Sequence, residues 1–189
     1  TGLVALMAAQ RGAGHAVDVE IDGMVAGQAC ENVRQSQWRD SIEVVCSDIT
    51  RYNPDEVKFD IIACNPPFFR DSLRSPNAVR SQARHNDSLS YEKLADTVLR
   101  LLANDGTFNL VLPFDMADTF TLIAARRGLY MSKRTKVVTR QGVAPKRVLL
   151  SFVKQQIAHV EEDELIMFDS NNAETLDYIS LVKDFYLKY

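Results

Sequence analysis

The sequence predicts an α/β fold with a mostly parallel sheet, and three observations support this prediction. Short runs of branched apolar residues alternate with segments of helical periodicity, as repeated βαβ units do. Hydrophobic residues make up 46% of the 189 and charged residues 25%, which is typical of one globular domain with a full core. Near the C-terminus, strand patterns follow one another with little helix between them, which indicates an antiparallel C-terminal edge. We therefore expect a single domain over residues 1–189.

The N-terminal part of the chain predicts helices and strands in alternation. Gly2–Gln10 is almost continuously apolar and is expected to be a core helix, and Val17–Ile21 alternates apolar and acidic residues as a strand does. Asp22 is well placed to cap the next helix. Ile42–Ile49 is a second strand, and Phe59–Cys64 is a third whose unbroken apolar character suggests burial on both faces.

The C-terminal part begins with an irregular segment. Asp71–Ser88 has no hydrophobic period and predicts a surface loop. A helix from Tyr91 is expected to close at a turn formed by Asp105 and Gly106. The remaining predicted elements are a strand at Phe108–Pro113, a helix capped by Asp115 and ending at Gly128, strands at Thr135–Thr139, Arg147–Val153 and Leu165–Phe168, and a helix with Leu176, Ile179, Val182 and Tyr186 on one face.

The chain opens in the middle of such a pattern. Thr1 and Gly2 look like the end of the glycine turn that joins a first strand to a first helix in nucleotide-binding sheets, and both are candidate cofactor contacts. We expect the natural protein to contain residues upstream, including a strand from the middle of the sheet, so that this domain is N-terminally incomplete. A sheet without that strand would have unpaired edges in its core.

The net charge of -3 conceals an asymmetric distribution. Thr119–Val160 holds nine Lys or Arg and no acid, whereas residues 161–189 hold eight acids against two lysines. A basic block on an acidic protein is a candidate contact for nucleic acid, although it is equally typical of a solvated face. The candidate contacts are Arg134, Lys136, Arg140, Lys146 and Arg147 in this block, and Phe69, Arg70 and Arg84 in the loop before it.

Composition argues against several other classes of protein. No apolar stretch approaches the ~20 residues that a membrane helix needs. Cys30, Cys46 and Cys64 form no close pair, so neither a disulfide framework nor a metal site is suggested. We expect a cytoplasmic protein with no metal, in which the cysteines are small core residues.

Polar residues follow three successive predicted strands: Glu20, Asp48 and Asn65. Because the carboxyl ends of parallel strands meet at one edge of a sheet, we expect all three to face one crevice. Glu20 can accept hydrogen bonds from both hydroxyls of a ribose, and Asp48 can accept one from an adenine amino group, with Ile49 packed on the ring. Taken singly, either acid is as typical of a helix cap or a loop.

The strongest signal is Asn65, Pro66, Pro67 and Phe68, directly after the third strand. The Asn65 side-chain oxygen and the Pro66 carbonyl can each accept one hydrogen of a planar amine, which frees its lone pair for attack. The prolines fix the direction of the carbonyl, and Phe68 offers a face on which a splayed base stacks. The alternative is a turn that merely ends the strand. This arrangement suggests methylation of an exocyclic amine.

With these residues, the chain resembles the bacterial tRNA(Val) adenine-N6 methyltransferases over essentially its whole length. The matching residues are Thr1 to Leu6, Val19 to Asp22, Ala29 and Asn32, Asp48, Asn65 to Phe68, and Asp184 to Leu187. The resemblance implies a Rossmann-like methyltransferase fold, S-adenosylmethionine held by Glu20 and Asp48, and a tRNA adenine held by Asn65 to Phe68. It departs from the family at the absent first strand and its glycines.

Other functions remain open from the sequence alone. The same tetrad occurs in enzymes that methylate guanine N2 in ribosomal RNA or glutamine N5 in proteins, although the latter more often have tyrosine in place of Phe68. A non-catalytic RNA-binding module is possible from another class, against which the retention of Glu20, Asp48 and Asn65 together argues. A nicotinamide oxidoreductase is disfavoured because no hydride-transfer site is recognisable.

Overall fold

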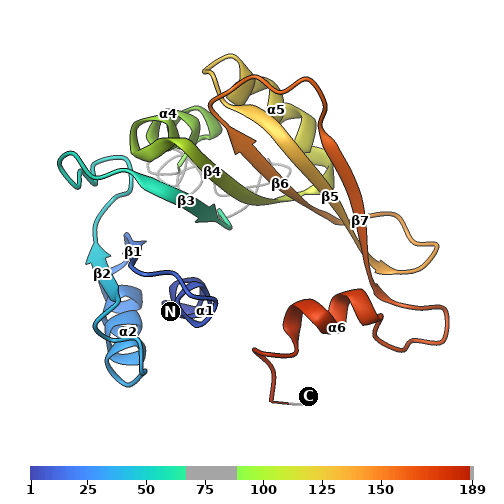
Figure 1. Ribbon diagram of the computed structural model, residues 1–189, viewed down its shortest axis with the longest axis horizontal. Coiled ribbons are helices and arrows are strands. Elements are labelled where there is room, and N and C mark those ends of the chain that lie inside the picture. Colours follow the sequence, from blue (N-terminus) through green and yellow to red (C-terminus); the bar gives the residue numbers. More distant parts are fainter. Residues whose placement is uncertain (67–88, 188–189) are drawn as a thin grey trace, which may run out of the picture. The chain divides into compact units, whose positions relative to one another are not determined.

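The computed structural model describes residues 1–66 and 89–187, which form two compact units, Thr1–Glu56 and Val57–Tyr189 (Figure 1). Strands and helices alternate through the first unit, and the last three strands of the second unit follow one another without a helix between them, as predicted. The elements are α1 (Leu3–Gln10), β1 (Ala16–Glu20), α2 (Gly23–Arg34), β2 (Ile42–Cys46), β3 (Phe59–Cys64), α4 (Tyr91–Leu101), β4 (Leu102–Pro113), the short 3-10 helix η1 (Phe114–Met116), α5 (Ala117–Ala125), β5 (Tyr130–Arg140), β6 (Arg147–Val153), β7 (Glu161–Phe168) and α6 (Leu176–Val182).

The first unit packs α1 and α2 with a parallel pair of strands. β1 pairs with β2 in register from Ala16 opposite Ile42 to Glu20 opposite Cys46. The Asp22 carboxylate accepts hydrogen bonds from the backbone N–H groups of Met24 and Val25, which confirms it as the cap of α2. Four of its buried side chains are alanines, and only Val33 and Ile42 are larger, so its core is thin.

The second unit contains, among its described residues, a five-stranded sheet in the order β3-β4-β6-β5-β7. β3 and β4 are parallel, β6 is antiparallel to both of its neighbours, and β7 is parallel to β5. One face of the sheet lies under α4 and α5 in Figure 1. There Phe108, Phe120 and Phe152 are fully buried, with the rings of Phe120 and Phe152 5.3 Å apart in an edge contact.

The α/β class and the mostly parallel sheet are confirmed, with two refinements of the predicted topology. The antiparallel strand is β6, which lies between β4 and β5, whereas the strand at the C-terminal edge, β7, is parallel to its neighbour. β3 is at the opposite edge of the sheet and pairs with β4 in the described residues. Its predicted burial on both faces is wrong, because Asp60, Ile61 and Ala63 are exposed, Ile61 by 69%.

Two local predictions are also wrong. Asp105 and Gly106 form no turn that separates a helix from a strand, because β4 runs through them; the register against β3 slips there, from Phe59 opposite Leu102 to Ile61 opposite Thr107. A Cβ on Gly106 would lie 2.9 Å from the Phe59 carbonyl oxygen, so only glycine fits this irregularity. Asp115 does not cap α5: it lies within η1, and α5 has no side-chain cap.

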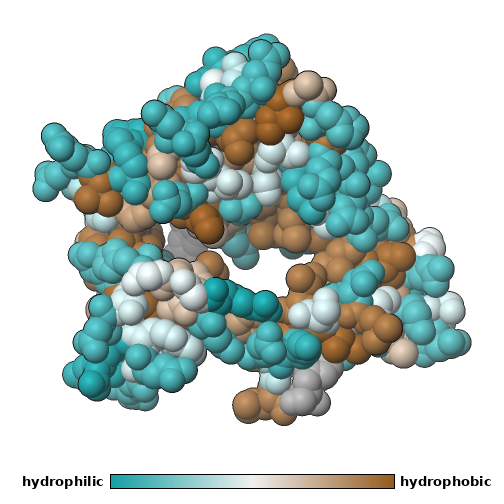
Figure 2. Space-filling view, viewed as in Figure 1, coloured by the Kyte–Doolittle hydropathy of each residue, from teal (hydrophilic) through white to brown (hydrophobic). Residues whose placement is uncertain are grey.

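The cysteines and the last helix differ from expectation as well. Cys30 and Cys46 are exposed, which contradicts the prediction that they are core residues, while Cys64 is partly buried. No residue of α6 is fully buried, and Leu176 and Leu181 are 82% and 52% exposed. Figure 2 shows hydrophobic surface beside hydrophilic surface around this helix. Within residues 1–66 and 89–187, every helix is too short or too polar to cross a bilayer.

Candidate functional site

The two acids predicted to bind a cofactor lie at the same end of the first unit's sheet. Glu20 is the last residue of β1, and Asp48 follows the end of β2 by two residues. The backbone N–H of Ser47 donates to the carbonyl oxygen of Glu20 at 2.9 Å, which ties the ends of the two strands together. The Glu20 side chain is 31% exposed, so its carboxylate is accessible at this edge.

Asp48 is held in a tight turn. One oxygen of its carboxylate accepts hydrogen bonds from both the backbone N–H and the hydroxyl of Thr50, each at 2.8 Å, and its carbonyl accepts from the N–H of Arg51 and Tyr52. These contacts fix the direction of the carboxylate without neutralising its charge. Ile49 is half-buried within the same turn.

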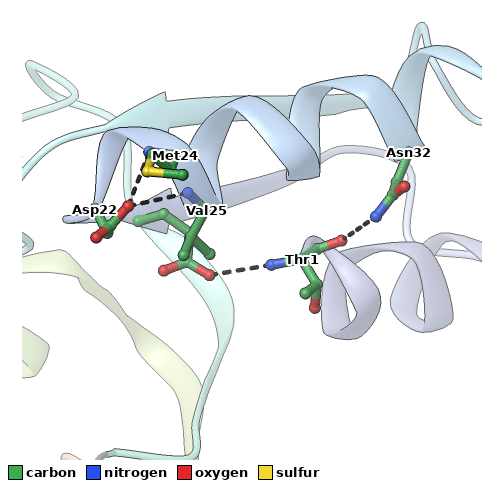
Figure 3. Close-up of polar contacts among 6 residues, drawn as sticks. Thr1, Asp22, Met24, Val25 and Asn32 are labelled. Carbon is green, nitrogen blue, oxygen red and sulfur yellow. Dashed lines mark hydrogen bonds and ion pairs between the residues drawn. The ribbon is translucent and has the colours of Figure 1, made fainter.

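The start of α1 is held against α2 by contacts that spacing along the sequence does not reveal. Gly2 precedes α1 with φ of 72°, and a Cβ there would lie 3.4 Å from the Cβ of the fully buried Ala29. The Asn32 side chain donates to the Thr1 carbonyl oxygen at 2.9 Å (Figure 3), and the Gln28 side chain donates to Asn32 at 3.1 Å. The amino group of Thr1 also lies 3.4 Å from the Glu20 carboxylate.

The sequence alone assigned no role to Asn32, which was only one of the residues that carry the family resemblance. A signal exists, because Asn32 lies three residues after Ala29 on α2 and shares its face. At this end of the unit Glu20 supplies carboxylate acceptors near a glycine turn that packs against Ala29, and the binding of a ribose there stays a prediction.

Asp18 lies on the same strand as Glu20, and its surroundings disfavour the charged form of its carboxyl. Burial raises the pKa of its carboxyl, the nearby charge of Glu20 raises it further, and the amino group of Thr1 opposes both. One of its carboxylate oxygens is buried without a hydrogen-bond partner among the described residues. Asp18 therefore destabilises this unit in its charged form.

Asn65 and Pro66 belong to the second unit, directly after β3. Asn65 is exposed and Pro66 is buried, so the amide is available to a ligand while the proline is enclosed. Cys64 before them packs against the main core, and burial raises the pKa of its thiol to about 11, so it stays protonated and unreactive at neutral pH. The prediction that Asn65 shares a crevice with Glu20 and Asp48 joins the two units and stays a prediction.

The basic residues of β5 divide between the two faces of the sheet. Arg134 lies opposite the fully buried Leu150 and faces the helices, where its guanidinium is 3.2 Å from the Asp118 carboxylate and 5.5 Å from the centre of the Phe114 ring. Its side chain is only 18% exposed. Lys136 follows on the same face and is half-buried. Contact of these two with RNA stays a prediction, and the geometry gives Arg134 a packing role.

Three other predicted RNA contacts are exposed. Arg140 ends β5, Arg147 begins β6, and Lys146 precedes it in the connecting loop. Arg140 donates to the side-chain oxygen of Asn172 at 2.6 Å, a neutral partner. The remaining candidates, Pro67 and Phe68 of the catalytic tetrad and Phe69, Arg70 and Arg84 of the following loop, lie outside the described residues.

Comparison with known proteins places this chain among methyltransferases. Residues 1–112 match the family model of the methyltransferase small domain. The tRNA1(Val) (adenine(37)-N6)-methyltransferase of Bacteroides fragilis is 46% identical over 192 aligned positions, which cover 100% of this chain and 80% of the relative. That of Bacteroides thetaiotaomicron is also 46% identical, over 99% of this chain and 79% of the relative.

A solved structure shows the same fold. The crystal structure of a predicted O-methyltransferase from Agrobacterium tumefaciens aligns with a TM-score of 0.66 and 18% sequence identity, over 88% of this chain and 76% of its own. At this level of identity the likeness extends to the fold alone.

Proposed function

We propose a function from the premise that this chain belongs to the methyltransferase small domain family and to the family of the tRNA1(Val) (adenine(37)-N6)-methyltransferases. The chain transfers a methyl group from S-adenosylmethionine to the exocyclic N6 amine of adenine 37 in tRNA1(Val). The observation that carries this proposal is Asn65 followed by Pro66 at the end of β3, an exposed amide on a strand that is packed against the core.

In the first unit, the chain's own residues bind the donor. S-adenosylmethionine supplies an electrophilic methyl group on a sulfonium. The Glu20 carboxylate accepts hydrogen bonds from its ribose hydroxyls, and Asp48, held in direction by Thr50, accepts from its adenine amino group with Ile49 beside the ring. The turn at Thr1 and Gly2 lies against the same ligand.

In the second unit, Asn65 and Pro66 orient the amine that is methylated. The lone pair of an exocyclic amine is delocalised into the ring, so it is a poor nucleophile until its nitrogen moves toward tetrahedral geometry. One amino hydrogen would bond the Asn65 side-chain oxygen and the other the Pro66 carbonyl, which leaves the lone pair free to attack the methyl carbon in line. As this bond forms, the bond from the methyl carbon to the sulfonium sulfur breaks, and S-adenosylhomocysteine leaves. The amine loses its proton after the transfer, so no strong base is needed.

The base must leave its stack to reach this site. An adenine in a single-stranded loop unstacks at a cost of a few kcal/mol, and Phe68 returns ~1–3 kcal/mol by stacking on the extruded ring. Pro67 holds the backbone between the two and restricts the conformations of Pro66. Phe69, Arg70 and Arg84, which follow in the sequence, are further candidates for contact with the substrate.

The test combines cofactor binding with methyl transfer to alternative substrates. Calorimetry of the protein with S-adenosylmethionine should show binding, and incubation with labelled donor should label a tRNA1(Val) transcript but neither ribosomal RNA nor a glutamine-containing peptide. Absence of donor binding would contradict any methyltransferase function. Donor binding with transfer to the peptide instead would identify a protein glutamine methyltransferase.

A further inference from the structure

The register of the second unit's sheet places the loop between β5 and β6 at the same end as Asn65. Cys64 of β3 lies opposite Leu110 of β4, which lies opposite Leu150 of β6. Three residues further along β4, Pro113 lies opposite Arg147. Two strand spacings of ~4.8 Å and a few residues of ~3.3 Å each place Arg147 roughly 10–15 Å from Asn65. Figure 1 shows this loop beyond the end of β4.

The loop is anchored to the strand that neighbours Asn65. The backbone N–H of Phe114 donates to the Lys146 carbonyl oxygen at 3.2 Å, which joins the loop to the end of β4. At the other side, the N–H of Gln141 donates to the Phe168 carbonyl oxygen at 3.0 Å. The side chains of Arg140, Lys146 and Arg147 are exposed on this anchored loop. Arg147 is therefore presented by a fixed backbone at the end of the sheet where the proposed catalytic residue lies, and Arg140, three residues beyond the Val137 that pairs with Arg147, lies farther out.

The cations of the opposite end of the sheet are arranged differently. Arg127 is 2.9 Å from the Asp96 carboxylate, Lys133 is paired with Glu161, and Lys154 donates to the Leu102 carbonyl oxygen at 2.7 Å. Burial lowers the pKa of Lys154, and the charge of Lys58 lowers it further. At this end Arg127, Lys133 and Lys154 are engaged in internal contacts while Arg126 is exposed, and at the other end Arg140, Lys146 and Arg147 are exposed, with Arg140 bonded to the neutral Asn172.

We propose that the loop of residues 140–147, which we term the basic loop, binds the phosphates that flank the extruded adenine. This inference rests on the proposed function and adds to it the surface that holds the RNA. Phosphate contacts carry no base information but fix the position and orientation of the nucleic acid. The basic loop thus sets the register of the RNA, while the residues after β3 select the base.

The two ends of the basic block provide a matched pair of variants. Lys146→Glu reverses a charge on the basic loop, and Arg126→Glu makes the same reversal at the far end of α5, where Arg126 is exposed. Binding of tRNA1(Val) is measured by filter retention across a range of salt concentrations. We expect Lys146→Glu to weaken binding by about tenfold at low salt and to lower the slope of log Kd against log salt by ~1, since one phosphate contact is lost.

We expect Arg126→Glu to leave both the affinity and the salt slope close to the wild-type values. Equal effects of the two variants, no effect of either, or a larger effect of Arg126→Glu would each overturn the proposal. Circular dichroism and the affinity for S-adenosylmethionine establish that each variant is folded. Lys146→Gln is a milder second variant, for which we expect an intermediate loss of tRNA affinity. If the wild-type protein binds tRNA but fails to methylate it, the proposed function is wrong and the basic loop is tested independently.

Discussion

The two units of this molecule differ in what fills their cores. The first is packed by small side chains: its buried residues include Ala5, Ala9, Ala26 and Ala29, and every residue of β1 is only half-buried. The second is packed, in its described part, by the rings of Phe108, Phe120 and Phe152 beneath two helices. The residues proposed to bind the donor thus lie on a thin scaffold, whereas Asn65 follows a strand fixed to a thick one. We therefore expect substitutions at the donor-binding residues of the first unit to change mainly the affinity for the donor. Substitutions in the aromatic core of the second unit should change mainly stability.

The largest expected effect comes from emptying the thick core. Phe120→Ala should lower the free energy of unfolding by about 3–5 kcal/mol, because it removes a fully buried ring that contacts three other aromatic side chains. Val33→Ala in the first unit should cost about 1–2 kcal/mol. Hydrogen exchange resolved along the chain should show the loss of protection confined to the unit that carries each change. Equal losses in both units would show that they unfold as one.

A smaller effect is expected from removing the hydrogen bond by which Asn32 holds the turn at Thr1 and Gly2. Asn32→Ala should raise the Kd for S-adenosylmethionine by about tenfold, since it removes a hydrogen bond that orients this turn, and Asn32→Asp should do the same because a carboxylate cannot donate. Gln35→Ala is the matched control, as its amide bonds Glu31 on the same helix. Calorimetry measures each affinity. An unchanged Kd in Asn32→Asp would remove Asn32 from the account of donor binding.

Replacing Arg134 shows whether this residue of the basic block stabilises the fold or binds RNA. Arg134→Ala should cost about 1 kcal/mol of stability, mostly through its stacking on Phe114, because Asp118 is 86% exposed and its ion pair is screened. The affinity for tRNA should change less than in Lys146→Glu. Thermal unfolding and filter binding, with the exposed Arg126→Ala as control, give the two quantities. A loss of tRNA affinity without a loss of stability would restore Arg134 as an RNA contact.

The smallest effect concerns the pH dependence of the first unit. Because the pKa of Asp18 is raised in the folded protein, the unfolded state ionises first, so the charged form weakens folding above the folded pKa and the penalty disappears as pH falls below the unfolded value. Asp18→Asn should therefore raise the melting temperature by about 1–2 °C at pH 7 and leave it unchanged near pH 3. Scans at the two pH values measure this. A greater gain at pH 3 than at pH 7 would contradict the direction of the shift.

Much of the fold could be predicted because local pattern and final structure agree. Phe59–Cys64 and Arg147–Val153 have the bounds that their apolar content predicts, and Asp22 caps its helix as its position suggests. The prediction of a turn at Asp105 and Gly106 was wrong because turn-forming residues can also lie in an irregular strand that pairs with a distant one. Ile61 is exposed because it points away from the face on which Ile62 and Cys64 pack against the core, and local pattern does not determine which face is covered.

The site was predictable in its residue types but not in its supporting contacts. Strand ends identify Glu20, Asp48 and Asn65 by position, whereas the bond from Asn32 to Thr1 joins residues 31 apart in the chain. The face of Arg134 depends on a register shift between Met131 and Lys133. Regular alternation from Met131 would have turned Lys133 to the helices and Arg134 to the open face, so one irregularity reverses which cations are accessible.

The central claim is that Asn65 orients an adenine amine for methyl transfer, and one measurement tests it most directly. Wild-type protein and Asn65→Ala are each incubated with S-adenosylmethionine and tRNA1(Val), and the digested nucleosides are analysed by mass spectrometry. The account predicts that N6-methyladenosine is formed with the wild-type protein. It predicts a rate lower by about 10²- to 10³-fold with Asn65→Ala, at an unchanged Kd for the donor. N6-methyladenosine formed by the variant at a comparable rate would contradict it.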